Sequence, residues 1–159
     1  MSKQASGDVS EAHVVARNRK ARHDYHILET WEAGIALSGT EIKSVRAGKV
    51  NLKGAFGVLR NGEVWLEGMN ISPYESSGYV THEPERSRKL LLHRREIRRL
   101  IGAVEQKGLT LVPLDMHFAK GYAKITLALA RGKRAPDKRE DLKKRSAERE
   151  MARSVGRQR

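Results

Sequence analysis

Short stretches in which apolar and polar residues alternate recur along the chain, and each predicts a half-buried β-strand. The clearest two span residues 56–60 and 63–67 and flank Asn61-Gly62, the preferred dipeptide of a type I′ turn. We therefore expect a β-hairpin here, with its second strand continuing through Met69 and Ile71 to Pro73.

Three further stretches have the same alternation. Residues 25–37 predict a strand, and the glycine at position 34 predicts a bulge or sharp bend within it. Residues 109–118 and 122–130 alternate on either side of Lys120-Gly121 and predict a second hairpin.

The period changes to that of a helix over residues 94–107, which end before Gly108. The apolar residues of this segment form one stripe at i, i+3, i+4 and i+7, namely Ile97, Leu100, Ile101 and Val104. Arg94, Arg95, Arg98 and Arg99 lie off the stripe, and a solvated helix face is the simplest interpretation of them.

A shorter helix is predicted after Ser38, because Ser38 and Glu41 have the spacing of a capping box and Gly48 stops the helix. Residues 72–89 contain Ser, Gly and Pro and predict an irregular loop, which at this length is often functional.

These elements give five or six short antiparallel strands with interposed helices. The order favours a mainly β fold with short helices, an oligonucleotide-binding-like antiparallel β-barrel. We expect three parts: a flexible N-terminal arm at 1–16, the barrel domain at 17–130, and a basic tail at 131–159.

Charge narrows the class of partner. The 159 residues include 32 Lys and Arg against 19 Asp and Glu, for a net charge of +13, and contain no cysteine. This composition excludes a disulfide framework and thiolate metal sites. No membrane-spanning run or signal peptide is visible, so we expect a soluble cytoplasmic protein without a membrane partner. A polyanion, with nucleic acid first, is the expected partner.

The tail carries much of this charge, with 12 Lys and Arg against 5 Asp and Glu. Glu140 with Lys144, and Asp141 with Arg145, are i,i+4 ion pairs that favour a helix. Its apolar stripe is thin, so we expect a conditional helix, disordered in free solution and completed on binding, with Gly132 and Pro136 as its hinge.

Several residues are candidates for RNA contact. Four cations stand at positions 17–22, and His23 and Tyr25 follow them. They form either a solvated lead-in to the first strand or a surface that neutralises phosphates and stacks on a base. Glu32 is either a solvent-facing strand residue or an acceptor for a base edge or ribose hydroxyl. His93 is either a helix cap or an RNA contact.

No pattern points to catalysis. The six histidines are scattered, and no phosphate-binding glycine loop or Gly-Gly-Gln motif occurs. We expect no enzyme activity, no cofactor and no metal. An RNA-binding adaptor is the leading hypothesis, a structural ribosomal protein or general RNA chaperone the second, and a peptidyl-tRNA hydrolase the third.

Five stretches together resemble the family of small protein B, the bacterial binding protein of transfer-messenger RNA (tmRNA) in trans-translation. They are Asn18 to Tyr25, Glu32-Ala33-Gly34, Glu41 to Lys49, Arg88 to His93, and Gly132-Lys133-Arg134 with Asp137-Lys138-Arg139. The resemblance implies a monomeric barrel that binds the tRNA-like domain of tmRNA and delivers it to stalled ribosomes. It also implies a tail that probes the small-subunit decoding region and empty mRNA channel, and an association with elongation factor Tu through charged tmRNA.

The resemblance assigns roles residue by residue. The implied RNA contacts are Asn18, Arg19, Lys20, Arg22, His23, Tyr25, Glu32, Leu92, His93 and Lys124. The implied ribosome contacts of the tail are Gly132, Lys133, Arg134, Asp137, Lys138 and Arg139. The chain departs from the family where His93 replaces a frequent Asn, where Pro136 replaces a His or Tyr, and where Phe56 lacks a hydroxyl.

Overall fold

The computed structural model describes residues 13–73, 83–105, 108–133 and 135–157. The strands are β1 (His13–Arg17), β2 (Tyr25–Ile35), β3 (Val50–Asn51), β4 (Phe56–Arg60), β5 (Glu63–Glu67), β6 (Asn70–Ile71), β7 (Arg88–Leu91), β8 (Leu109–Ala119) and β9 (Tyr122–Gly132). The helices are α1 (Arg19–Asp24), α2 (Gly39–Arg46), α3 (Arg94–Val104) and α4 (Ala135–Arg157).

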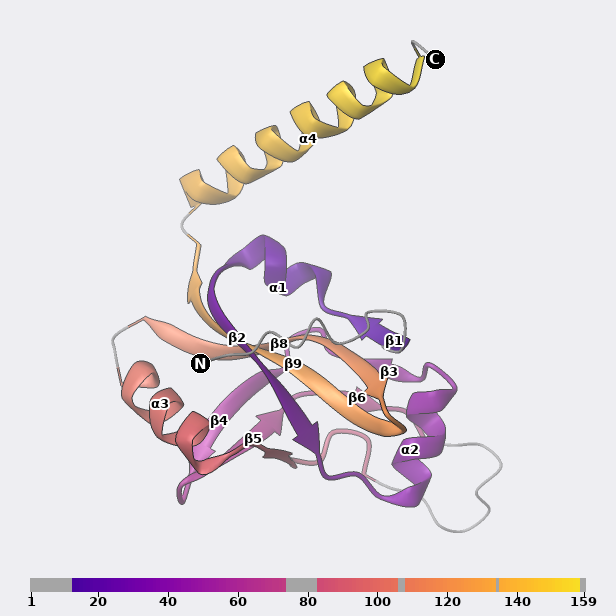
Figure 1. Ribbon diagram of the computed structural model, residues 1–159, viewed down its shortest axis with the longest axis vertical. Helices are drawn as coiled ribbons and strands as arrows, with labels where there is room; N and C mark the ends of the chain where they lie inside the picture. Colours follow the sequence, from indigo (N-terminus) through magenta and orange to yellow (C-terminus); the bar gives the residue numbers. More distant parts are fainter. Residues whose placement is uncertain (1–12, 74–82, 106–107, 134, 158–159) are drawn as a thin grey trace.

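The main sheet closes on itself. Its strand order is β1-β8-β4-β5-β7-β2-β9, and an additional β8–β9 pairing joins the last strand to β8. Six strands therefore form a ring, and β1 adds to β8 (Figure 1). All the pairings are antiparallel, and β3 and β6 form a separate small sheet. The predicted mainly β barrel with short helices is confirmed.

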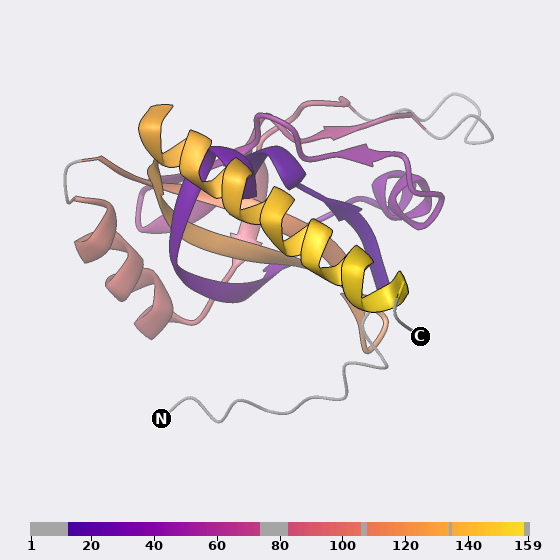
Figure 2. The same ribbon diagram turned by 90° about the horizontal axis from the view of Figure 1, so that it is seen from above.

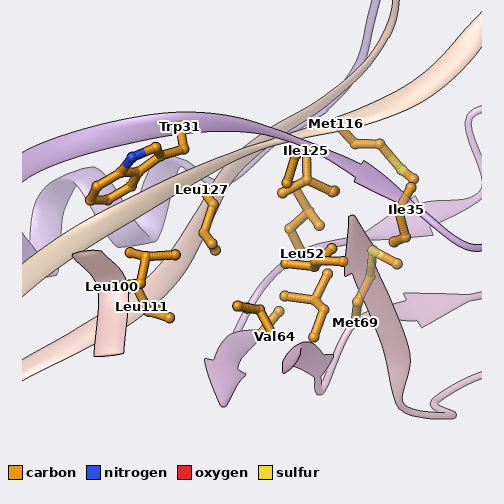
Figure 3. Close-up of a cluster of buried hydrophobic side chains, with 14 of the residues drawn as sticks. Trp31, Ile35, Leu52, Val64, Met69, Leu100, Leu111, Met116, Ile125 and Leu127 are labelled. Atoms are coloured by element: carbon orange, nitrogen blue, oxygen red, sulfur yellow. The ribbon is translucent and has the colours of Figure 1, made fainter. Parts of the chain in front are cut away.

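The interior of the ring is filled by aliphatic side chains from nearly every strand, together with Trp31 (Figure 3). Leu100 of α3 is fully buried in the same cluster, so the apolar stripe of α3 covers part of the barrel as predicted. A second cluster lies on the other face of β8 and β9, where Val112, Leu114 and Ala128 pack against Ala21 of α1. Both faces of β8 and β9 are thus buried in part.

Local signals in the sequence were reliable. The hairpin has the predicted bounds, and Asn61 (φ 52°) and Gly62 (φ 73°) have the positive φ angles of a type I′ turn. The capping box of α2 is present: Ser38 Oγ accepts from the Glu41 N–H, and Glu41 Oε1 accepts from the Ser38 N–H.

Two strand predictions were wrong in detail. The second hairpin strand ends at Glu67, because the chain turns at Gly68 (φ 77°), and Asn70–Ile71 pairs instead with β3. The bulge in β2 lies between Ile27 and Glu29, not at Gly34. Gly34 has a different reason to be glycine, since a Cβ there would lie 3.2 Å from Leu91 Cβ on the neighbouring strand.

Other boundaries also differ from the prediction. Residues 13–16, predicted as part of a flexible arm, belong to β1 and pair with β8. The basic segment before β2 contains helix α1, which the pattern of residues did not predict. The predicted loop 72–89 ends earlier, because β7 begins at Arg88; its residues 74–82 lie outside the described part, as do residues 106–107 of the predicted helix.

A buried ion pair joins α2 to β7. The side chains of Glu41 and Arg88 are both fully buried, and Arg88 Nε donates to Glu41 Oε2 at 2.5 Å. Arg86 also donates to Glu41 Oε1. Burial alone raises the pKa of Glu41, but the hydrogen bonds from Arg86, the Ser38 N–H and Arg88 outweigh it and lower the pKa. The charged pair therefore holds α2 against the chain that enters β7.

The tail continues directly from the barrel. Strand β9 extends to Gly132, which pairs with Tyr25, and the Lys133 N–H donates to the Asp24 carbonyl. The predicted hinge at Gly132 is therefore wrong, because this residue is held in the sheet; Pro136 lies within the first turn of α4. Figures 1 and 2 show α4 leaving the barrel on the side of α1. None of the described helices is both long and apolar enough to cross a membrane.

Candidate nucleic-acid interface

Four of the predicted RNA contacts meet in one groove, which we call the first groove. It has a volume of about 630 Å³ and lies between β2, β7, β9, the β4–β5 turn and the start of α3. Glu32, Leu92, His93 and Lys124 line it, with Arg94 beside His93. Cross-strand pairing explains this meeting, because Gly34 of β2 pairs with both Lys124 of β9 and Leu91 of β7.

The charges of the first groove are unevenly paired. Each lining carboxylate has a partner: Glu32 contacts His117 at 3.3 Å, Glu63 contacts Lys89 at 3.0 Å, and Glu96 accepts from the His93 N–H at 3.1 Å. Within the described part of the chain, Lys124 and Arg94 have no ion pair. The lining cations Lys89, Arg94 and Lys124 thus equal the carboxylates Glu32, Glu63 and Glu96 in number, but Lys124 and Arg94 remain available for a phosphate group.

A chain of polar side chains stands behind Glu32. Nε2 of His117 faces Glu32 Oε2, and its Nδ1 lies 2.8 Å from Asp115 Oδ1, which also accepts from Thr126 Oγ1 at 2.9 Å. A neutral imidazole has one N–H and can donate to only one of the two carboxylates, whereas the protonated ring can donate to both. His117 is buried, and its contact with Glu32 Oε2 orients the Glu32 carboxylate in the first groove.

Sequence reasoning missed His117, because its relation to Glu32 spans 85 residues. The register of β9 with β2 and β8 creates this relation by placing Thr126 between Glu32 and Asp115. Only the strand pairing could have revealed it.

The other RNA-contact candidates lie elsewhere. A second groove of about 690 Å³ is lined by Asn18, Lys20, Tyr25, Lys53 and Phe56, among others, and shares no lining residue with the first. It lies beside α1, whose Arg19, Lys20 and Arg22 are exposed. Cations and two aromatic rings with accessible surface thus surround this groove, a combination typical of single-stranded RNA contact.

Asn18 has an internal role. It is 5% exposed, and its amide donates to the carbonyls of Pro113 and Leu52 while its Oδ1 accepts from the Ala21 N–H. Its side chain therefore caps α1 and ties it to the barrel, and its contact with RNA stays a prediction. His23 is half-buried, and its Nδ1 lies 2.9 Å from Asp24 Oδ1.

The tail motif begins on the barrel and continues on α4. The carbonyl of Arg22, at the C-terminal end of α1, accepts from Lys133 Nζ and from Arg145 Nη2, each at 3.3 Å. Cations at a helix C-terminus are favourable, so α1 helps to orient the start of the tail. Asp137, Lys138 and Arg139 lie in the first turns of α4, and Arg134 is outside the described residues.

The described residues contain no group of three or more His, Asp or Glu side chains that could hold a metal ion. The described surface has two grooves that are lined in part by cations, and a basic helix, a set of features suited to binding RNA.

Comparison with known proteins agrees with this geometry. A family model described as "SmpB protein" matches residues 15–157. The SsrA-binding protein of Nostoc punctiforme is 59% identical over 143 residues, which cover 89% of this chain and 92% of the relative. That of Salinispora arenicola is 59% identical over 144 residues, 91% of each chain.

A solved structure gives the same result. A chain in the structure described as "tmRNA-SmpB: a journey to the center of the bacterial ribosome" is 61% identical and superposes with a TM-score of 0.65 over 76% of this chain and 85% of that one. Sequence, fold and the residues gathered in the grooves agree, and the chain belongs to the SmpB protein family.

Proposed function

We propose that the protein binds the tRNA-like domain of tmRNA and delivers it to stalled ribosomes for trans-translation. Its relatives are SsrA-binding proteins, and the similar solved chain comes from a structure of tmRNA, SmpB and the ribosome. The observation that carries the proposal is the first groove, where Glu32, His93 and Lys124 converge and where Lys124 forms no ion pair with any described residue.

Three side chains of the first groove have separate tasks in this function. The Glu32 carboxylate, oriented by His117, accepts a hydrogen bond from a base edge or a ribose 2′-hydroxyl. Lys124 neutralises a neighbouring phosphate, and Leu92 offers an apolar surface to a base. The Glu32 carboxylate supplies selectivity, because it repels the phosphate backbone of an RNA that offers it no hydrogen-bond donor.

Strand β9 couples RNA binding to the tail. It carries Lys124 in the first groove and ends at Gly132, about 26 Å further along the strand at 3.3 Å per residue. Because β9 is paired on both sides, by β2 and β8, it forms a rigid connection between the first groove and the start of the tail. The bound RNA and the start of α4 therefore have a defined geometry, which directs the tail.

The finer parts of the proposal concern the ribosome. The tail residues Gly132, Lys133, Arg134, Asp137, Lys138 and Arg139 contact the small-subunit decoding region and the empty mRNA channel. The protein acts in the cytoplasm as a monomeric adaptor, without a cofactor and not as an enzyme, and meets elongation factor Tu through charged tmRNA.

The test is a comparison of RNA affinities. Wild-type protein binds tmRNA much more tightly than bulk tRNA, and Glu32→Ala weakens the binding of tmRNA by about 1–3 kcal/mol, the value of one specific base contact. Glu105→Ala removes an exposed carboxylate from the end of α3 and is the matched control. Equal affinity of the wild type for tmRNA and bulk tRNA would refute the proposal.

A further inference from the structure

The N-terminal half of α3 carries four arginines within six residues, and all four are exposed: Arg94, Arg95, Arg98 and Arg99. Only Arg99 is paired, with Glu29 at 2.9 Å. In the part of the chain that the structure describes, the other three form no ion pair. They lie on a continuous face of the helix, away from the stripe of Ile97 and Leu100 that covers the core.

This placement opposes the stability of the helix. Cations are unfavourable at a helix N-terminus, where the macrodipole is positive, and the last turn of α3, where they would be favourable, contains none. Arg94 with Arg98, and Arg95 with Arg99, are like charges at i,i+4, which repel. The fold of α3 needs only its apolar stripe and the Glu96 carboxylate that accepts from the His93 N–H. The arginines therefore require another explanation.

The arginine face continues the first groove. Arg94 lines the groove together with Lys124, and Arg98 stands one turn further along α3, about 6 Å along its axis. Arg95 extends the same face outward. The result is a basic track that starts at the unpaired cation of β9 and runs along the exposed side of α3. Guanidinium groups bind phosphate oxygens in a bidentate way, which an exposed row of this kind permits.

We propose that Arg94, Arg95 and Arg98 of α3 form a contact surface for the phosphate backbone of the RNA that occupies the first groove. The proposal rests on the proposed function for the identity of that RNA, namely tmRNA. The groove reads a base or ribose at Glu32, and the arginine face holds the adjoining phosphates and fixes the direction in which the RNA leaves the groove.

The experiment measures the affinity of full-length protein for tmRNA over a range of salt concentrations. Arg94→Gln with Arg98→Gln should bind tmRNA about ten-fold more weakly at low salt, and the slope of log K against log salt should decrease by about 2, one unit for each phosphate that is no longer neutralised. Arg94→Lys with Arg98→Lys keeps the charges and should retain most of the slope.

The control removes two cations at the opposite end of the barrel, Lys43 of α2 and Lys120 of the β8–β9 turn, by substitution with Gln (Figure 1). It should leave the slope close to that of the wild type. Thermal melts separate binding from folding: the double Gln variant in α3 should melt no lower than the wild type, because a repulsion has been removed.

The outcomes separate the two proposals. A wild type that does not prefer tmRNA over bulk tRNA contradicts the proposed function, whatever the arginines do. A wild type that prefers tmRNA, with the same slope in the α3 variant and the control, overturns the arginine contact. Unchanged tmRNA binding with weaker binding to empty ribosomes also overturns it and assigns the face to ribosomal RNA.

Discussion

Neutralising Glu41 should destabilise the barrel more than neutralising any charged side chain on the surface. Glu41→Gln keeps the shape of the side chain but leaves Arg88, a fully buried cation, without its counter-charge. Either orientation of the new amide also brings its NH₂ group against a donor. If the amide oxygen faces Arg88 Nε, the NH₂ group faces the Ser38 N–H and Arg86, and the reverse orientation places it against Arg88.

The expected cost follows from the burial of both partners. Removing one member of a buried ion pair typically costs about 3–5 kcal/mol, because the remaining charge stays desolvated. Arg88 keeps its hydrogen bonds to the carbonyls of Met69 and Pro84, at 2.9 and 3.1 Å, so we expect about 3 kcal/mol. For a chain of this length, that corresponds to a decrease of about 10 °C in Tm.

The assay is urea unfolding followed by tryptophan fluorescence, since Trp31 lies in the core. Glu63→Gln is the matched control: its partner Lys89 is at 3.0 Å, but both side chains are 41% exposed, so the loss should be at most about 1 kcal/mol. Arg88→Met combined with Glu41→Gln should cost less than the sum of the two single changes, because the unpaired charge is gone. A loss for Glu41→Gln no larger than that of Glu63→Gln would refute the reasoning.

Three further predictions concern pH, packing and the tail. The pKa of Glu41 is lowered from its ordinary 4.5, so the unfolded chain takes up the proton first as pH falls. The stability advantage of the wild type over Glu41→Gln should therefore be complete above about pH 4.5 and disappear as pH falls through the folded pKa. A difference between the two urea midpoints that widens in acid contradicts this. Gly57→Ala places a Cβ 2.8 Å from Leu111 Cβ, at the β4–β8 pair that closes the barrel, and should lower the free energy of unfolding by about 1–3 kcal/mol in thermal melts. Gly102→Ala, on the open face of α3, should raise it by about 0.5–1 kcal/mol. Equal effects of the two changes would be inconsistent with the close approach at Gly57. Ending the chain after Lys133 keeps the strand pairing of Gly132, so it should leave tmRNA binding intact and abolish trans-translation on stalled ribosomes. A peptide of residues 135–157 should show little helix by circular dichroism. Loss of tmRNA binding, or a stable helical peptide, would contradict our assignment of RNA binding to the barrel and of ribosome contact to the tail.

The elements that local chemistry specifies were predictable. The Asn61-Gly62 turn, the capping box at Ser38 and the apolar stripe of α3 each depend on residues a few positions apart. Such signals need no knowledge of the rest of the chain. The same holds for the antiparallel barrel as a class, because alternating strands with short connections have few other ways to bury their apolar faces.

The elements that were missed depend on distant partners. Helix α1 is six residues long and buries only Ala21, and the side chain of its cap, Asn18, is held by carbonyls 34 and 95 residues away. Strand β1 has no strong alternation and exists because β8 offers it an edge. The predicted loop 72–89 contains Arg88, whose burial is explained only by its ion pair with Glu41 of α2.

The candidate site divides in the same way. The sequence by itself determined which residue types were available and, through resemblance to a family, which of them we predict to contact RNA. It did not separate those residues into two grooves, join His117 to Glu32, or continue the groove onto the arginines of α3. Tertiary structure decided these relations, because strand register and barrel closure place together side chains that are far apart in the sequence, such as Glu32 and Lys124, which are 92 residues apart. Periodicity along the chain contains no information about that register.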